Sequence, residues 1–269
     1  MVGAITKRAL RILLFIGIMF LIVSLSPFVV RPLQGTNLYP LVGSVVFFLT
    51  FFLLYITPLS FVNWEGEDSL GPLGLNIDDE KMNIDLSIGL VSGAISAFFV
   101  VLMAIVFGGT LRPLSEIGSN LIMGQIIITI PTALLEELCY RGYLLSRMTQ
   151  LIGRRMAIIG SSAVFSLLHF SWWIPLGSVS MLLVILFTLN IAMGGIVLGV
   201  GYFRTGNKLW LPIGFHFSWN MVGYIMFPQF PLVPVEMPYL YQIEWGLTTI
   251  PGFLIGLVMV LVLTRKKNR

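Results

Sequence analysis

Long apolar runs separated by short polar connections dominate the pattern of this chain. A run of about 18 or more apolar residues predicts a membrane-spanning helix, because about 20 residues of helix cross the hydrocarbon core of a bilayer. The apolar runs lack the alternation of a transmembrane barrel, and open strands cannot cross lipid with unpaired backbone groups. The pattern therefore predicts about eight helices, over residues 12–30, 38–62, 86–107, 121–145, 156–174, 179–203, 211–227 and 247–264.

The basic residues between these runs indicate their orientation. Of the 16 Lys and Arg residues, eight crossings place 13 on the side of the two termini and only Arg31 and Arg112 on the other, while Arg141 lies within a run. Because basic loops stay in the cytoplasm, we expect both termini to be cytoplasmic. The net charge of +4 then follows from membrane topology, and we expect no nucleic-acid partner.

The composition supports one membrane domain over residues 1–269, an all-α polytopic bundle. The chain is 57% hydrophobic and 10% charged, whereas a soluble domain is roughly a quarter charged. The longest polar connection, residues 63–85, is expected to be a solvated loop, with a short amphipathic segment around Leu73 to Ile77 as the alternative. Gly195 and Gly199 have the spacing that lets two membrane helices approach closely, and the single cysteine, Cys139, is expected to pack in the interior.

Three ionisable side chains interrupt the fourth apolar run, in the stretch "PTALLEELCYRGYLL". An ionised side chain at the centre of a membrane helix costs about 2.5–3.5 kcal/mol, so each needs a partner. Glu137 and Arg141 are four residues apart with the acid first, which is the favourable order for a helical ion pair. Glu136 is left without a partner in the local sequence.

The two histidines of the chain lie in other apolar runs. His169 ends the stretch "FSLLH" in the fifth run, and His216 begins "HFSWN", which ends at Asn220, in the seventh. Counting about 1.5 Å of rise per helical residue from the nearest basic residues places these side chains and Glu136 in the middle of the membrane. We therefore expect them to meet, with both imidazoles satisfying Glu136.

Such a set of polar groups suits hydrolysis of an amide bond. A carboxylate in a low-dielectric cavity has a raised pKa, so Glu136 can act as general base toward water. His169 would orient the water and protonate the leaving amine, and His216 and Asn220 would stabilise the oxyanion. Alternatively, His169, His216 and Glu136 would bind a catalytic zinc ion. The sequence leaves both mechanisms open; we slightly favour the metal-free one, in which Glu136 need not also be a ligand.

The three stretches "EELCYR", "FSLLH" and "HFSWN" resemble, in order, the EExxxR, FxxxH and HxxxN/D motifs of the CPBP intramembrane proteases. This family contains the type II CAAX prenyl endopeptidases and the bacteriocin-immunity (Abi) proteins, and the resemblance covers residues 131–220. It implies a multi-pass peptidase of the cell membrane, labelled in many members as a metalloprotease, with a cavity open to the cytoplasm. The implied catalytic residues are Glu136, His169, His216 and Asn220, with Glu137, Arg141 and Phe165 completing the motifs.

The resemblance leaves the substrate open, because family members cleave prenylated CAAX tails, process other peptides, confer immunity or act as scaffolds. We expect a peptide or membrane-anchored protein substrate, with a prenylated tail as one candidate. Two other functions remain as alternatives: a noncatalytic immunity or scaffold protein, and a proton-coupled transporter, since intramembrane Glu and His also serve as proton relays.

Overall fold

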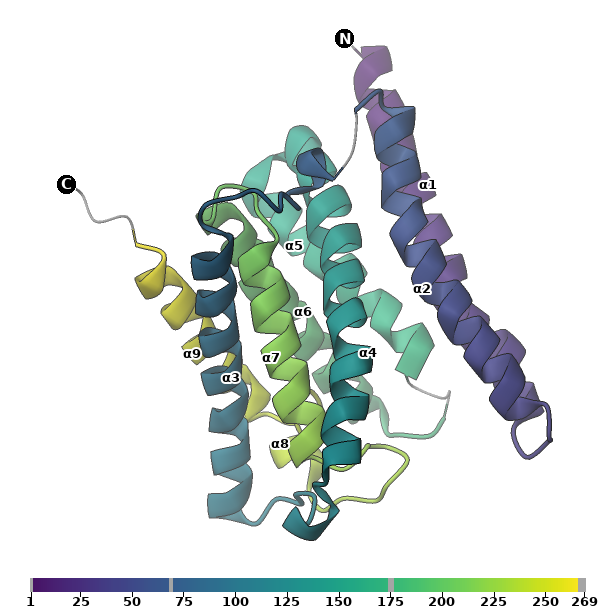
Figure 1. Cartoon of the computed structure of the whole chain (residues 1–269), viewed down its shortest axis with the longest axis vertical. Coiled ribbons are helices and arrows are strands. Elements are labelled where there is room, and N and C mark those ends of the chain that lie inside the picture. The colour runs from purple at the N-terminus through teal and green to yellow at the C-terminus, as the bar shows by residue number, and fades with distance from the viewer. Residues whose placement is uncertain (1, 68–69, 174–176, 266–269) are drawn as a thin grey trace.

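The computed structural model describes residues 2–67, 70–173 and 177–265, and within these ranges every regular element is helical (Figure 1). The prediction of an all-α bundle is confirmed. The expected end of the fifth run at Ile174, and the basic residues Lys266, Lys267 and Arg269, lie outside the described residues.

Each of the eight apolar runs is helical. The long elements are α1 (Val2–Leu25), α2 (Tyr39–Trp64), α3 (Met82–Phe107), α4 (Ser119–Glu137), the π-helix η5 (Leu138–Leu145), α5 (Ser146–Trp173), α6 (Met181–Arg204), α7 (Trp210–Met226) and α9 (Thr249–Leu263). A π-helical turn, Ser26–Val30, continues α1, and the connections carry the short helices η2 (Arg31–Leu33), η3 (Gly71–Leu73), η4 (Leu114–Glu116) and α8 (Pro238–Tyr241).

Five stretches of the described chain are long and apolar enough to cross a membrane: Ile5–Leu33, Tyr39–Trp64, Met82–Phe107, Ser119–His169 and Met181–Arg204. The fourth stretch has 51 residues and contains two predicted runs. It is not one straight helix, because Gly153 in α5 has a φ of 73° and breaks the helical path. The last two runs form shorter helices, of 17 residues in α7 and 15 in α9.

Glycines set the closest helix contacts. Gly89 and Gly93 of α3 face the α7 backbone so closely that a Cβ on Gly93 would overlap the carbonyl oxygen of Phe215. The sequence analysis missed this pair, although it has the same four-residue spacing as Gly195 and Gly199. The predicted close approach is confirmed at Gly195, where a Cβ would lie 2.8 Å from the Cβ of Ser162 in α5. These contacts hold α7 against α3, and α6 against α5.

The connection between α2 and α3 is mostly exposed, as expected of a solvated loop, but it is docked on the bundle at a few points. Leu73 is fully buried, and a Cβ on Gly142 of η5 would lie only 2.8 Å from its carbonyl oxygen. The backbone N–H of Leu209 donates to the carbonyl of Gly74. Ile77 is 70% exposed, so the segment as a whole does not present one apolar face. Leu73 thus packs directly against η5.

An ion pair fixes the rest of this connection. The Lys208 ammonium contacts the Asp79 carboxylate and, with a hydrogen bond from the backbone N–H of Lys81, holds the pKa of Asp79 below its usual value. The Trp210 indole N–H donates to the carbonyl of Asn76 over 2.9 Å. The polar connection is thus tied to the first turn of α7.

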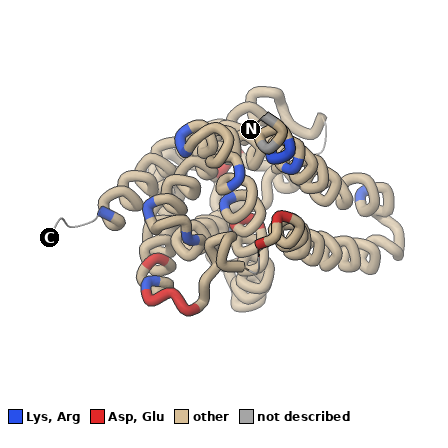
Figure 2. The backbone as a smooth tube through the Cα atoms, turned by 90° about the horizontal axis from the view of Figure 1, so that it is seen from above, with Lys and Arg blue, Asp and Glu red and all other residues tan. Residues whose placement is uncertain are grey.

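The helices run alternately up and down, so connections gather at two ends. The first turn of α1, the α2–α3 connection, the last turn of α9 and the start of α7 share one end (Figure 1). Figure 2 looks down on this end and shows basic segments spread across it. The opposite end carries the connections 108–118 and 227–248. We call these the terminal end and the loop end.

Candidate active site

The two adjacent glutamates leave the last turn of α4 in different directions, as their helical rotation requires. The Glu137 side chain is fully buried, whereas that of Glu136 is 18% exposed. The π-helix η5 starts directly after them and carries Cys139 and Arg141 into the interior. The Cys139 thiol is buried and donates to the carbonyl of Leu54 over 3.1 Å, which agrees with the expected packing role.

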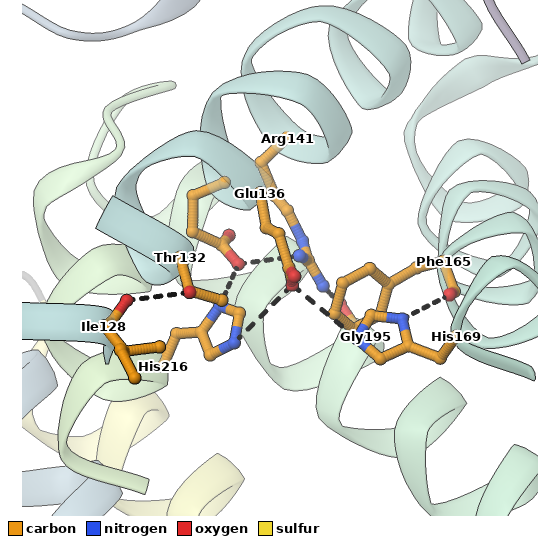
Figure 3. Close-up of polar contacts among 9 residues, drawn as sticks. Ile128, Thr132, Glu136, Arg141, Phe165, His169, Gly195 and His216 are labelled. Atoms are coloured by element: carbon orange, nitrogen blue, oxygen red, sulfur yellow. Dashed lines mark hydrogen bonds and ion pairs between the residues drawn. The ribbon is translucent and has the colours of Figure 1, made fainter. Parts of the chain in front are cut away.

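Glu137 has two side-chain partners, Arg141 and His216, where the sequence predicted only Arg141. Its Oε1 atom accepts a hydrogen bond from Nη1 of Arg141 over 2.7 Å, and Nδ1 of His216 lies 2.9 Å from the same oxygen (Figure 3). The predicted ion pair is present. The hydrogen bond between His216 and Glu137 was not expected from the sequence, which paired both imidazoles with Glu136 only.

Arg141 is 2% exposed and binds three helices together. Its guanidinium lies over the Phe165 ring of α5, 4.4 Å from the centroid, and Nη2 lies 3.4 Å from the carbonyl oxygen of Gly195 in α6. Phe165 therefore contacts two polar residues of the site. The Arg141 guanidinium lies over its ring, and the His169 ring packs against it with the two ring centroids 4.3 Å apart.

Both imidazoles turn their second nitrogen toward Glu136. Nε2 of His169 lies 3.6 Å, and Nε2 of His216 3.8 Å, from Oε2 of Glu136 (Figure 3). Nδ1 of His169 lies 2.8 Å from the Phe165 carbonyl oxygen, so this nitrogen carries the hydrogen. The neutral tautomer of each ring then presents an Nε2 lone pair to Glu136, whose Oε2 is buried without a hydrogen-bond partner. The side chains predicted to converge do so.

Asn220 lies one helical turn beyond His216 on α7. It is 5% exposed and lines the same cavity as Glu136, His169 and His216. All four residues predicted from the sequence thus surround one space. Thr132, one turn before Glu136, also lines it and uses its hydroxyl to bind the carbonyl of Ile128.

The cavity has a volume of about 250 Å³ and extends from Glu136 toward the loop end. Its described lining comes from Arg112, from α4 to α7 and α9, and from residues 227–230 and 242–245, with no residue from the connections of the terminal end. On that side the buried segment η5 and Leu73 close the bundle. A cavity that opens at the loop end would face away from the side that carries the termini, so the expectations of cytoplasmic termini and of a cavity open to the cytoplasm pull in different directions.

The expected zinc ligands do not form a ready metal site. No group of three His, Cys, Asp or Glu side chains in the described chain is positioned to hold a metal ion. In particular, Nδ1 of His216 is engaged by Glu137, and both Nε2 atoms are directed at one oxygen of Glu136 rather than around a common centre. This arrangement does not fit a three-ligand zinc site.

The sequence analysis missed the polar groups at the far end of the cavity. Gln242 and Glu244 line it there, and the carboxylate of Glu244 accepts a hydrogen bond from the Trp219 side chain. Burial raises the pKa of Glu244 to about 7. The signal available in the sequence was the occurrence of these two polar residues in a connection otherwise rich in proline and aromatic side chains.

Comparison with known protein families gives a match over the part of the chain that carries these residues. Residues 118–222 match the family described as "Type II CAAX prenyl endopeptidase Rce1-like". This segment begins just before α4, ends in α7 and includes Glu136, His169, His216 and Asn220. A comparison with curated proteins gives no match. Over residues 118–222, the chain is thus similar to the type II CAAX prenyl endopeptidase Rce1-like family.

Proposed function

We propose that the protein is an intramembrane endopeptidase in which Glu136 activates the attacking water. The observation that carries the proposal is the placement of two imidazole Nε2 atoms around one oxygen of Glu136, at 3.6 and 3.8 Å. Separations slightly longer than a hydrogen bond suit a bridging water. A water that donates to Oε2 of Glu136 lies within reach of both rings.

The residues then divide the reaction between them. Glu136 removes a proton as the water oxygen bonds to the carbonyl carbon of the substrate. The amide carbonyl becomes an oxyanion, which the amide N–H groups of Asn220 stabilise. Collapse of this intermediate breaks the carbon–nitrogen bond, and the leaving amine takes the proton that Glu136 removed from the water, either directly or by way of Nε2 of His169. The products are a carboxylic acid and an amine, as hydrolysis requires.

Glu137 and Arg141 act on the geometry rather than on the substrate. Glu137 holds Nδ1 of His216, and Arg141 neutralises Glu137 while contacting Phe165. Rate enhancement of this kind depends on groups held in place before the reaction. We therefore assign these two residues as positioning residues.

The metal requirement is part of the same test. If the enzyme requires zinc, extensive dialysis against a chelator abolishes cleavage and added zinc restores it. The metal-free proposal expects cleavage to survive that treatment, with less than one equivalent of metal per chain by elemental analysis of the active protein.

We further propose that the cavity faces the outer side of the membrane. The 13 basic residues on the terminal side, against Arg31 and Arg112 on the other, support cytoplasmic termini, and the cavity extends toward the opposite end. The substrate would then be a peptide or membrane-anchored protein presented from outside. A prenylated CAAX tail, which is made in the cytoplasm, becomes the less favoured candidate.

The decisive experiment compares the wild-type protein with Glu136→Gln, which keeps the size of the side chain and removes the base. Membrane and secreted peptides from cells carrying each form are compared by mass spectrometry. The control is Glu236→Gln, which makes the same substitution at an exposed glutamate outside the cavity. We expect at least one cleavage product to disappear with Glu136→Gln only. If a biological effect of the protein persists undiminished in Glu136→Gln while the variant is inserted normally, the scaffold alternative is favoured over the peptidase.

A further inference from the structure

Glu244 occupies a backbone position that the surrounding fold imposes. Its φ is +66°, in the left-handed region that residues other than glycine rarely adopt. Its N–H donates to the Thr249 hydroxyl over 2.9 Å, and its carbonyl accepts from Nδ2 of the fully buried Asn190, also over 2.9 Å. Such strain persists only where several contacts over-determine the conformation, and it is common at ligand-binding positions. The residue is therefore held in one orientation.

That orientation places the Glu244 side chain in the wall of the cavity. The Trp219 side chain donates to its carboxylate, and the charges of His216 and Glu136 act on it. The titratable side chain of Tyr224 also lines the cavity and is influenced by Glu244. The carboxylate thus faces the same space as the candidate catalytic residues, from a segment that carries none of them.

A second buried acceptor lies beside it. Gln242 is 5% exposed and also lines the cavity. Its Nε2 atom donates to the carbonyl of Pro228 over 3.1 Å, which directs the amide, and its Oε1 atom is buried without a hydrogen-bond partner. A buried acceptor left unpaired costs about 1–3 kcal/mol, so a donor from a ligand would be strongly favoured here.

No lysine or arginine of the described cavity wall is available to neutralise Glu244. Arg112 is the sole Lys or Arg of the described lining. Its Nε atom donates to the carbonyl of Ile225 and its Nη2 atom to that of Phe227, while Nη1 lies 3.8 Å from Glu116. With this guanidinium engaged by the backbone, no lysine or arginine of the described lining pairs with the carboxylate of Glu244.

We propose that Glu244 and Gln242 form a subsite that binds a cationic nitrogen group of the peptide substrate, a lysine or arginine side chain or a free amino terminus. Most of the other lining residues of the cavity are apolar, among them Phe187, Ile191 and Phe253. The preferred substrate is therefore an apolar peptide segment with one basic group on one side of the cleaved bond. This inference rests on the proposed peptidase function and adds the substrate class.

Binding is measured separately from cleavage, so that the two proposals can fail separately. The probes are fluorescent apolar decapeptides that differ at one position, with lysine, norleucine or glutamate, each with an acetylated or a free amino terminus. Binding to the purified full chain carrying Glu136→Gln is followed by fluorescence anisotropy in detergent micelles. The same chain with Glu244→Gln added tests the subsite, and Glu236→Gln added is the matched control, because Glu236 is exposed and lies outside the cavity.

We expect the lysine peptide to bind about tenfold more tightly than the norleucine peptide, and the glutamate peptide to bind most weakly. Glu244→Gln abolishes this preference and Glu236→Gln preserves it. A preference for the free amino terminus instead of the lysine identifies the amine as the recognised group and also supports the subsite. Equal affinities, a preference that survives Glu244→Gln, or no binding of any peptide overturns it. Cleavage of the same peptides by the wild-type chain tests the peptidase proposal independently.

Discussion

At the scale of single residues, Glu137 is the buried carboxylate on which two other side chains of the site depend. It is fully buried between Arg141 and His216, and its Oε2 atom has no further partner. Removing one member of a buried ion pair leaves the other charge uncompensated, which costs about 3–5 kcal/mol. We expect Glu137→Gln to lower the free energy of unfolding by about this amount and to reduce cleavage, because His216 loses its anchor.

The chain contains a matched control for this prediction. Glu116 and Arg112 also form an ion pair four residues apart, but at 3.8 Å and with the glutamate 59% exposed. An exposed pair contributes about 0–1 kcal/mol. Reversible unfolding in mixed micelles, followed by circular dichroism, should show a small change for Glu116→Gln. Equal losses in the two variants would contradict the assigned role of Glu137.

The pKa of Glu244 leads to a pH dependence of basic-peptide binding. Burial raises this pKa to about 7, with contributions from Glu136, which raises it, and from the Trp219 hydrogen bond and His216, which lower it. Because the carboxylate gains its charge as the pH rises, we expect affinity for a lysine peptide to increase between about pH 6 and pH 8. Imidazoles also titrate in this range, so the comparison is with Glu244→Gln, in which the increase should be absent.

The same carboxyl affects stability in the opposite sense. Its folded pKa lies above the usual value of 4.5, so the folded state holds more protons than the unfolded state between about pH 4.5 and 7. Stability therefore falls as the pH rises through this window. Glu244→Gln should flatten this part of the profile when the unfolding midpoint is measured at successive pH values.

At the scale of helices, the contact between α3 and α7 positions half of the site. A Cβ on Gly93 would overlap the Phe215 carbonyl oxygen, directly before His216. We expect Gly93→Ala to destabilise the protein by about 1–3 kcal/mol through overpacking and to lower cleavage by displacing His216. Gly17→Ala in α1 is the control, since a Cβ there meets nothing within 4 Å. A helical glycine replaced by alanine in open space gains up to about 1 kcal/mol, so the two variants should change stability in opposite directions.

The existence of the helices was predictable because the apolar runs show where the chain can cross a bilayer. Their ends were less so: α1 begins at Val2 and α5 at Ser146, each ten residues before the expected runs at 12 and 156. The pairing of Glu137 with Arg141 was also predictable, because it depends only on spacing along one helix. The partner of His216 was not predictable, because the choice between Glu136 and Glu137 depends on how α7 is rotated against α4. That rotation is set by glycine contacts such as Gly93, whose partners lie far away in the sequence. Glu244 was missed for a related reason: its connection has no periodic pattern to show which side chains turn inward.

At the scale of the whole molecule, the side of the membrane on which the termini lie decides which side the cavity faces, because the cavity extends from Glu136 toward the loop end. We expect a cysteine in place of Glu236, at the loop end, to react with a membrane-impermeant maleimide in intact cells. A cysteine in place of Gln150, near the start of α5 at the terminal end, should react only after the membrane is permeabilised. Both positions are exposed. The reverse labelling pattern would place the termini outside and open the cavity to the cytoplasm.

The single thiol of the chain, buried at the start of η5 and bonded to the carbonyl of Leu54, has a practical consequence for every spectroscopic study of this protein. Because Cys139 is buried, thiol-reactive spin labels and fluorophores should not react with the unaltered chain, so the native cysteine need not be removed before labelling cysteines are introduced. Two labels placed at exposed positions on either side of the cavity would report its width in an otherwise unaltered protein.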